Sequence, residues 1–443
     1  MTLSAAAERV MALLHGAGYE AFAVGGCVRD ALLGREIHDF DICTSALPEQ
    51  MARCFEDLRV IPTGLAHGTL TVLCEGEAVE VTTFRCDGAY TDHRHPQQVS
   101  FVPDVEQDLA RRDFTVNAMA WNAERGLIDP FGGRQDLQNK VLRCVGDPMA
   151  RFEEDALRVL RALRFAARFD LAVEPATARA MHAAAPLLRR ISGERILQEL
   201  RGLLAAPDPE KVLLDFADVM AVIVPELADA VGFAQNSRYH CYDVYTHCVK
   251  AACAVPSEPP VRLALLLHDC AKPQCYTEEN GVGHFYGHAT KSEQAAREVL
   301  TRLHADNACI KRVCALIHWH DVPLKAEPAA VRRLLQRLGT QGLHQLLQVK
   351  KGDALAHHPD HQSERLQQIG RVRQLMQEIL QAPVCLSVRD LAIGGEDLRA
   401  LGMAAGPAMG RLLRRLLDAV IEGALPNERE ALLVAAKKST LNQ

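Results

Sequence analysis

The sequence of 443 residues lacks any long hydrophobic run. Its longest strongly apolar stretch, Leu263–Leu267, is far too short to cross a bilayer, so no membrane partner is expected. The segment Met1–Glu20 has neither a basic start nor an apolar signal core. The fourteen cysteines include no CxxC pair. Without an export signal, this pattern favours reduced thiols and predicts a cytoplasmic protein.

A general surplus of positive charge is also missing. The net charge of −6 argues against a protein that coats RNA over its whole surface, so a nucleic-acid site would have to be local. From Arg143 to Arg201 there are 11 arginines, no lysine and 8 acidic residues. This segment is either such a patch or a solvated helical face with ordinary ion pairs. Histidines gather between His240 and His361, which is a hint of metal binding.

Composition changes near residue 145. Before it, "YEAFAVGG" and "LTVLCEGEAVEVTTF" have the β-branched, partly alternating pattern of strands. After it the pattern is helical, with proline-containing breaks at 206–211, 255–260 and 382–387. We therefore predict an α+β fold. Its parts are a head with a small mixed sheet at 1–145, a helical neck at 146–235, a helical domain at 236–380 and a helical tail at 381–443.

The sharpest local feature of the head is "VGGCVRDALLG". Val24 ends a predicted strand, Gly25 and Gly26 form a turn, and a helix is predicted over 28–33. Backbone N–H groups of such a turn can hold phosphate oxygens, and Arg29 can clamp a triphosphate. Taken alone, a Gly-Gly pair before a helix is usually only a turn.

Two aspartates follow at Asp39 and Asp41. Residues i and i+2 of a strand point to the same face, so these carboxylates could hold two Mg²⁺ ions close together. Glu80, in the alternating segment "VEVTTF", is the candidate third carboxylate. An isolated D-x-D is otherwise a turn or a helix cap.

The segment "RRDFTVNAMA" offers a second cluster. Arg111 and Arg112 can bind a triphosphate, and Asn117 can bind a ribose hydroxyl. The structural alternative is a helix capped by Asp113, with the apolar side chains that follow it packed inward.

Further along, "EEDALRVLRALRF" places four charged residues three apart on one predicted helix: Asp155, Arg158, Arg161 and Arg164. The alternative to a ligand-binding role is a set of helical ion pairs such as Glu154 with Arg158.

Strung together in this order, these motifs resemble class II tRNA nucleotidyltransferases of the polymerase-β-like superfamily, over residues 20 to about 200. The resemblance implies metal binding by Asp39 and Asp41, with Glu80 beside them, and recognition of the incoming base by Asp155 and Arg158. The nucleotide-binding set that we expect is Gly25, Gly26, Arg29, Arg112, Asp113, Asn117, Asp155, Arg158, Arg161 and Arg164. The implied substrates are tRNA, ATP and CTP.

The family contains CCA-adding, CC-adding, A-adding and poly(A)-adding members. "TGLAHGTLTV" is similar to the tRNA enzymes, and the arginine-rich stretch and basic tail typical of bacterial poly(A) polymerases are missing. The segment "FRCDGAYTDHRHPQQV" is similar to the flexible loop of CCA- and A-adding enzymes. CCA addition is therefore favoured, with A-only addition or a poly(A) polymerase as alternatives. The sequence leaves the oligomeric state open.

From "YDVYTHCVK" onward the chain resembles the HD superfamily of metal-dependent phosphohydrolases. The implied ligands are His247, His268, Asp269 and Asp353, a donor set that suits Mn²⁺, Co²⁺, Ni²⁺ or Fe²⁺. The auxiliary candidates are His288 and His320, and the weaker ones are His284 and His318. The usual HDIGK reads "HDCAK" here, which leaves hydrolysis as an open question. A further alternative is a hydrolase whose head only binds nucleotide.

Overall fold

The computed structural model describes residues 1–88, 99–381 and 383–441, which form two compact units, Met1–Pro225 and Glu226–Gln443. Most of the predicted flexible loop, residues 89–98, lies outside the described residues. The predicted head and most of the predicted neck share the first unit, and the finer division into four parts stays a prediction. In the described ranges, no helix is long and apolar enough to span a membrane.

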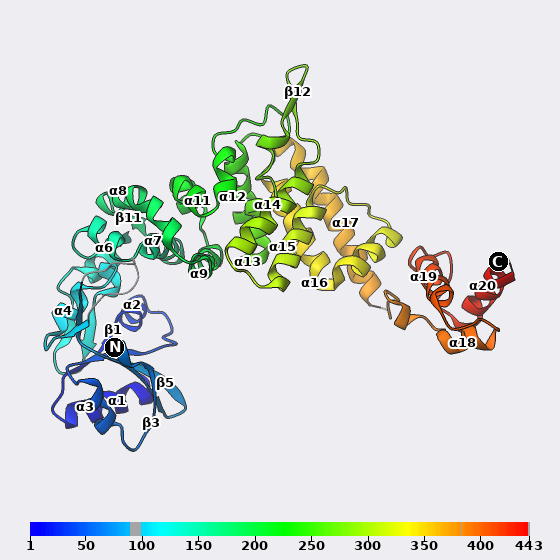
Figure 1. Ribbon diagram of the computed structural model, residues 1–443. Helices are drawn as coiled ribbons and strands as arrows, with labels where there is room; N and C mark the ends of the chain where they lie inside the picture. Colours follow the sequence, from blue (N-terminus) through cyan, green and yellow to red (C-terminus); the bar gives the residue numbers. More distant parts are fainter. Residues whose placement is uncertain (89–98, 382, 442–443) are drawn as a thin grey trace. The chain divides into compact units, whose positions relative to one another are not determined.

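The first unit is built on a seven-stranded sheet, drawn in blue and cyan in Figure 1. The strand order is β3-β4-β5-β2-β1-β8-β9, and β2 and β5 are the parallel pair among antiparallel neighbours. The sheet is therefore mixed, as predicted. Its strands are β1 (Ala21–Val24), β2 (Asp41–Thr44), β3 (Arg59–Gly64), β4 (Thr69–Cys74), β5 (Glu77–Thr83), β8 (Ala120–Asn122) and β9 (Gly126–Ile128).

Apolar side chains hold this sheet to the helices beside it. Phe22 of β1 and Phe84, just after β5, are fully buried, and their ring centroids lie 6.1 Å apart. Val105 and Leu109 of α4 (Val105–Ala110) pack into the same core. Helix α1 (Ala5–Gly16) begins after Ser4, whose hydroxyl accepts a hydrogen bond from the amide of Ala7. A ribbon of β6 (Arg85–Asp87) and β7 (Val99–Phe101) pairs apart from the main sheet.

Helices make up most of the rest of the first unit. Helix α7 buries one stripe of side chains, including Leu160 and Leu163, while its arginines line another, so it packs on α9 by an apolar face. The helices are α2 (Gly26–Leu32), α3 (Pro48–Cys54), α5 (Gly133–Gln138), α6 (Pro148–Glu154), α7 (Leu157–Phe169), α8 (Pro175–Ala184), α9 (Gly193–Leu204), α10 (Glu210–Asp215) and α11 (Ala217–Ile223).

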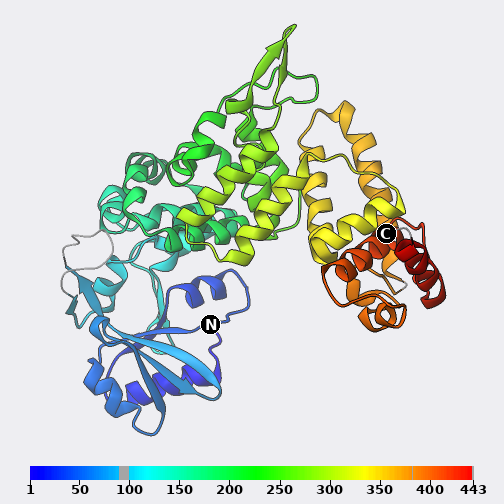
Figure 2. The same cartoon turned by 45° about the vertical axis from the view of Figure 1, so that its right-hand side comes forward.

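The second unit is helical apart from the hairpin β12 (Thr277–Glu279) and β13 (Val282–His284), which projects from it in both views (Figures 1 and 2). Gly352 lets α16 approach α12 closely, because a Cβ there would lie 2.5 Å from the carbonyl oxygen of Ala251. The helices are α12 (Val244–Cys253), α13 (Pro259–Leu267), α14 (His288–Arg302), α15 (Asn307–His320), α16 (Pro328–Leu355) and α17 (Gln362–Leu380).

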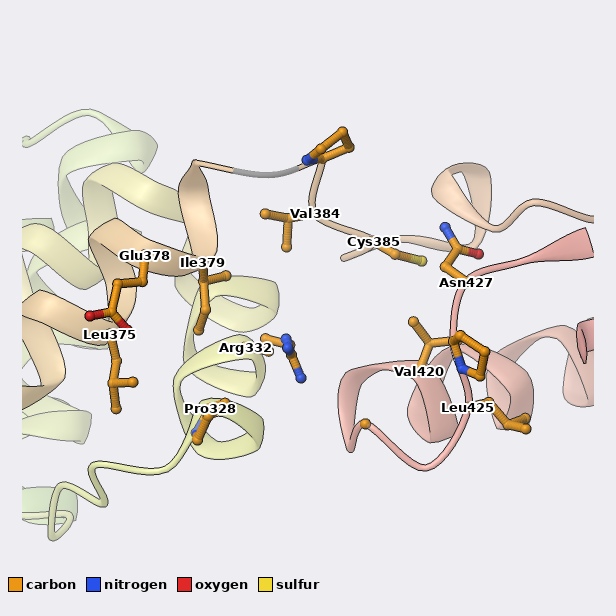
Figure 3. A pocket seen from close by; sticks show the side chains of 13 residues that line it. Pro328, Arg332, Leu375, Glu378, Ile379, Val384, Cys385, Val420, Leu425 and Asn427 are labelled. Atoms are coloured by element: carbon orange, nitrogen blue, oxygen red, sulfur yellow. The ribbon is translucent and has the colours of Figure 1, made fainter.

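The last part of the second unit has a small apolar core of its own, shared by α18 (Gly395–Ala400), α19 (Pro407–Ile421) and α20 (Arg429–Leu441). Helix α19 is amphipathic, because it buries Leu412, Leu416 and Ile421 in this core while its arginines lie on another face. A pocket of about 630 Å³ is lined by side chains of α16, α17 and this part, among them Arg332, Glu378 and Asn427 (Figure 3).

Candidate active site and metal centre

Two carboxylates lie side by side on the parallel strands β2 and β5. Asp41 is opposite Glu80 in the register. Asp39 lies just before β2, which begins at Asp41, so only one of the two aspartates is on the strand that was predicted to carry both. Burial raises the pKa of Asp41 and of Glu80, and the charge of Asp39 raises both further. The structure therefore brings three carboxylates close enough to repel one another.

The turn after β1 lies against Arg112. Gly25 has a φ of +74°, which favours glycine, and helix α2 begins directly afterwards at Gly26. A Cβ on Gly25 would lie 2.8 Å from Nη1 of Arg112. The charge of Arg112 also acts on Asp41, because it lowers the pKa that burial raises. The glycine turn, the arginine and the carboxylates thus form one cluster.

Arg29 is buried next to this cluster and is already bonded. Its Nε and Nη2 donate to the carboxylate of Asp30 at 2.9 and 3.0 Å, and Nη1 donates to Oδ1 of Asn117 at 2.6 Å. Its guanidinium carbon lies 4.3 Å from the ring centroid of Phe169. These contacts fix Arg29 in place, and within the described parts of the chain they use three of its five N–H groups, so two remain for a ligand.

The segment after Arg112 is not the predicted helix. It forms a 3₁₀ turn over Thr115–Asn117 and then enters β8. The apolar residues that were predicted to pack inward do so: Phe114, Val116 and Met119 are fully buried. The helical alternative is therefore wrong, because the segment forms a short turn that leads into a strand, while its apolar residues are buried as that alternative expected.

Asp113 links this turn to α7. Its carboxylate accepts from Nδ2 of Asn117 at 3.2 Å and from Nε and Nη2 of Arg161 at 2.8 and 2.7 Å. Burial alone would raise the pKa of Asp113, but Arg161, Arg158 and the hydrogen bond from Asn117 together outweigh burial, and the pKa is lowered. The aspartate therefore positions Asn117 and Arg161 together.

A break at Asp155 divides the single helix that was predicted for this segment. Helix α6 ends at Glu154, and Asp155 has an extended backbone with φ −140° and ψ 102°. Its Oδ1 accepts from the amide of Leu157 at 3.0 Å, and its Oδ2 accepts from Arg195 at 2.8 Å. The side chain thus caps the start of α7 and lies outside that helix.

Three of the four arginines of α7 are each paired with a carboxylate. Arg158 pairs with Glu154 at 2.6 Å, which confirms the predicted ion pair. Arg164 pairs with Glu199 at 2.6 Å, and Arg161 pairs with Asp113. These pairs fix the three side chains, and the pair with Asp113 links Arg161 to Asn117, which lies near the glycine turn.

The second unit brings together all six of the principal histidines and aspartates predicted for it. They come from different helices: His247 from α12, His268 and Asp269 from the end of α13, and Asp353 from α16, with His288 and His320 from α14 and α15. Nε2 of His247 lies 3.1 Å from Oδ1 of Asp353, and Nε2 of His268 lies 3.6 Å from the same oxygen.

Asp269 stands between two pairs of histidines. Its Oδ2 lies 3.5 Å from His247 and 3.2 Å from His268. Its Oδ1 lies 3.3 Å from His288 and 3.5 Å from His320. Within the described residues, the buried atoms His268 Nε2 and Asp269 Oδ1 have no hydrogen-bond partner. Unpaired buried polar atoms are costly, so these donors fit one or two metal ions.

The two weaker histidine candidates lie elsewhere. His318 is half-exposed and pairs with Glu293 at 3.0 Å. The ring of His284 stacks on Tyr286, with 5.4 Å between centroids. Neither belongs to the groups of side chains that could hold a metal in the described parts of the chain.

Three residues near the cluster were not predicted. His357 lies one helical turn after Asp353, with its Nδ1 3.6 Å from Oδ1 of that aspartate, and its ring centroid is 4.5 Å from that of His240. Burial lowers the pKa of His240 to about 2 and that of His357 to about 4. Arg365 contacts the other oxygen of Asp353 at 3.5 Å. The histidine-rich "ALAHHPDH" was the signal in the sequence.

Models of known protein families match segments of both units. A family model described as the poly A polymerase head domain matches residues 21–143. A second, the probable RNA and SrmB-binding site of polymerase A, matches 170–231, and a third, the putative tRNA nucleotidyltransferase domain 2, matches 275–436.

Similarity to individual proteins extends over almost the whole chain. A CCA-adding enzyme of Levilactobacillus brevis is 34% identical over 441 residues, which cover 97% of this chain and 96% of that protein. A CCA-adding enzyme of Streptococcus mutans is 33% identical, with 97% and 96% covered. The crystal structure of the Bacillus stearothermophilus CCA-adding enzyme in complex with CTP aligns with a TM-score of 0.73 at 30% identity, and covers 98% of this chain and 96% of that one. The chain therefore belongs to the family of CCA-adding enzymes, which are tRNA nucleotidyltransferases.

Proposed function

We propose that this protein adds C, C and A to the 3′ ends of tRNA, with CTP and ATP as donors. The observation that carries the proposal is the cluster of Asp41, Glu80 and Arg112 beside the Gly25 turn. The names of its relatives support it, as does the relative that was solved with CTP. The tRNA would lie along the helices of residues 170–231 and be recognised by shape and backbone. A cytoplasmic location stays a prediction.

The carboxylates are proposed to hold the divalent metal that nucleotidyl transfer uses. Asp39 and Asp41, with Glu80 beside them, form an oxygen-only donor set, which suits Mg²⁺. Burial, and after it the neighbouring carboxylate charges, raises the pKa values of Asp41 and Glu80, so their ionised forms are disfavoured and a bound cation would stabilise them. When bound, such ions activate the attacking 3′-hydroxyl and neutralise the departing pyrophosphate. The 3′-hydroxyl would lose its proton to water, its oxygen would bond to the α-phosphorus, and the bond from that phosphorus to the departing pyrophosphate would break.

The residues around the glycine turn are proposed to hold the incoming nucleotide. Gly25 and Gly26 leave the turn free of side chains, so that triphosphate oxygens can approach its backbone. Arg112 and the two unused N–H groups of Arg29 would donate to the triphosphate. Asn117, fixed by Asp113, would bind the ribose.

The choice between bases is assigned to Asp155 and Arg158. C and A both present an exocyclic amine beside an unprotonated ring nitrogen, so a carboxylate accepts from the amine and a guanidinium donates to the nitrogen. U and G have the opposite polarity and would leave buried polar groups unpaired. In the structure Asp155 is bonded to Arg195, and Arg158 to Glu154. These partners pre-position both groups, and the base would replace part of their hydrogen bonding.

The test is incorporation of labelled CTP and ATP into three tRNA transcripts, which end before the C, after CC, and after CCA. Addition of C, C and A to the first, of A to the second and of nothing to the third supports CCA addition. Extension of only the second transcript would make this an A-adding enzyme. Long A-tails on any RNA would make it a poly(A) polymerase.

A second activity, hydrolysis of phosphate esters, is proposed for the second unit. The orphaned atoms of His268 and Asp269 carry this proposal, because they converge with His247 and Asp353 on a position that suits Mn²⁺, Co²⁺ or Ni²⁺. A 2′,3′-cyclic phosphate at an RNA end is a sensible substrate, since it must be opened before extension. Water oxygen would bond to phosphorus, and the ester oxygen would leave with a proton.

Metal removal tests this second activity. Protein stripped with EDTA should not open 2′,3′-cyclic AMP, and Mn²⁺, Co²⁺ or Ni²⁺ should restore the reaction. The Asp353→Ala variant should stay inactive with every metal but keep CCA addition. A wild-type protein that binds these metals and hydrolyses neither this ester nor bis(p-nitrophenyl) phosphate would contradict the proposal.

A further inference from the structure

Basic side chains surround the metal-binding cluster of the second unit, and most of their donors are already used. Lys272 is almost fully buried, and its Nζ lies 2.6 Å from Oδ2 of Asp269. It also donates to Gln235 at 2.8 Å and lies 3.3 Å from Nε2 of His240. An ammonium group has three donors, so Lys272 is fully engaged in holding the cluster.

Lys350 is engaged in a similar way. Its Nζ donates to the main-chain carbonyl oxygens of His320 and Val322, both at 2.6 Å. These bonds tie the end of α15 to α16, and therefore fix the backbone that carries His320. Lys350 therefore supports the cluster through the backbone of His320.

Arg365 differs from both lysines because its side chain is 45% exposed. Nη1 lies 3.5 Å from Oδ2 of Asp353 and donates to Nε2 of His357 at 3.2 Å. Within the described residues, its Nε and Nη2 make no hydrogen bond. Arg365 also lies in the first turn of α17, where a cation opposes the helix dipole, so helix stability does not explain its place.

His357 fixes the direction of this guanidinium. The ring is 4% exposed, and its Nδ1 lies 2.7 Å from the main-chain oxygen of Asp353. A carbonyl oxygen only accepts, so Nδ1 carries the proton and Nε2 is free to accept from Arg365. The ring also packs against His240, with 4.5 Å between centroids. A buried side chain thus holds a half-exposed cation at the edge of the cluster.

We propose that Arg365 binds the phosphate group of the ligand at this centre and that His357 is the positioning residue that holds it there. The inference rests on the phosphohydrolase function proposed for the second unit. Asp353 turns Oδ1 toward His247 and Oδ2 toward Arg365, so a single carboxylate separates the metal-binding histidines from the guanidinium. A planar guanidinium with free N–H groups matches phosphate oxygens in pairs.

The competing role for Arg365 is to orient Asp353 as a metal ligand. An outer-shell partner of that kind changes metal affinity when it is replaced. A phosphate-binding residue instead changes phosphate affinity and leaves the bound metal in place. The two roles therefore separate when metal content and phosphate binding are measured on the same protein.

The experiment titrates inorganic phosphate into the full-length protein loaded with Mn²⁺, by calorimetry, after metal content is measured by mass spectrometry. Arg365→Gln should weaken phosphate binding about 10- to 100-fold, the usual effect of losing a charge-assisted hydrogen bond, with unchanged Mn²⁺ content. Arg365→Lys keeps the charge without the fork and should be intermediate. His357→Phe should resemble Arg365→Gln. Arg371→Gln, at an exposed arginine of the same helix, is the matched control and should bind phosphate normally.

Several outcomes would overturn the inference. Unchanged phosphate binding by Arg365→Gln would remove the residue from this role, and a loss of Mn²⁺ from that variant would assign it to metal orientation. Wild-type protein that takes up Mn²⁺ but binds no phosphate would also refute it. If wild-type protein takes up no metal at all, the proposed phosphohydrolase function fails first. If it hydrolyses bis(p-nitrophenyl) phosphate and Arg365→Gln does so with an unchanged KM, only this inference fails.

Discussion

Replacing Gly25 by alanine should weaken nucleotide binding as well as the fold. Its backbone, at φ +74° and ψ −123°, costs a residue with a side chain about 1–3 kcal/mol. At about 2–4 °C per kcal/mol for a unit of this size, Tm should fall by about 2–12 °C. The new Cβ would also lie 2.8 Å from Nη1 of Arg112, so the guanidinium must move. Loss of one charge-assisted phosphate contact should raise KM for CTP and ATP about 10- to 100-fold.

Gly126→Ala is the matched control for this variant. Gly126 has a φ of +70° at the start of β9, directly after the turn of the β8–β9 hairpin, and a Cβ added there would have no neighbouring atom within 4 Å. It should therefore lose stability through backbone strain alone, with KM unchanged. Calorimetric unfolding and steady-state incorporation with each nucleotide give the two readouts. If Gly25→Ala also keeps the wild-type KM, the link between the turn, Arg112 and the triphosphate is refuted.

Three other variants test the head. Asp41→Ala should reduce incorporation more than about 1000-fold, because a catalytic metal contributes several kcal/mol, while tRNA binding on filters persists; normal incorporation would sink the assignment. Asp155→Asn should lower discrimination against UTP and GTP more than it lowers Tm, and unchanged selectivity would remove this residue from base reading. Asp113 has a lowered folded pKa, so its stabilisation is present above its unfolded pKa of about 3.9 and is lost as pH falls through the folded value. Asp113→Asn should lower the unfolding free energy at pH 7 by about 1–3 kcal/mol, which is less than the loss of a fully buried pair would cost because Arg161 is a third exposed. In urea titrations down to pH 3, the stability of this variant should depend less on acid than that of the wild type. An unaltered pH profile would contradict the pairing of Asp113 with Arg161.

Strands of the head could be predicted from sequence where apolar and polar residues alternate. Val79 and Val81 alternate with exposed residues along β5, and both are buried as the pattern requires. The order of the strands was not predicted, because the parallel pairing of β2 with β5 depends on contacts between distant segments. The break at Asp155 was also missed. Apolar residues continue at helical spacing across it, and the bond that holds it comes from Arg195, forty residues further on.

The residues of the candidate sites also differ in whether local sequence was enough to predict them. Residue type and order were enough to select His247, His268 and Asp269, because few other side chains bind transition metals. His357 and Arg365 escaped prediction since their importance lies in a shared contact with Asp353, which a sequence pattern does not show.

The parallel pairing of β2 with β5 has a consequence for stability. It sets Asp41 beside Glu80, and the raised pKa of each means that the folded chain resists their ionisation. Above those pKa values, folding must bury two ionised carboxylates and bring them near other negative charges, so both carboxylates weaken the fold at neutral pH. The carboxylates that are proposed to act in catalysis therefore lower the folding stability of the head. Divalent cation should recover what is lost, so that the folded head is most stable when it is ready to react.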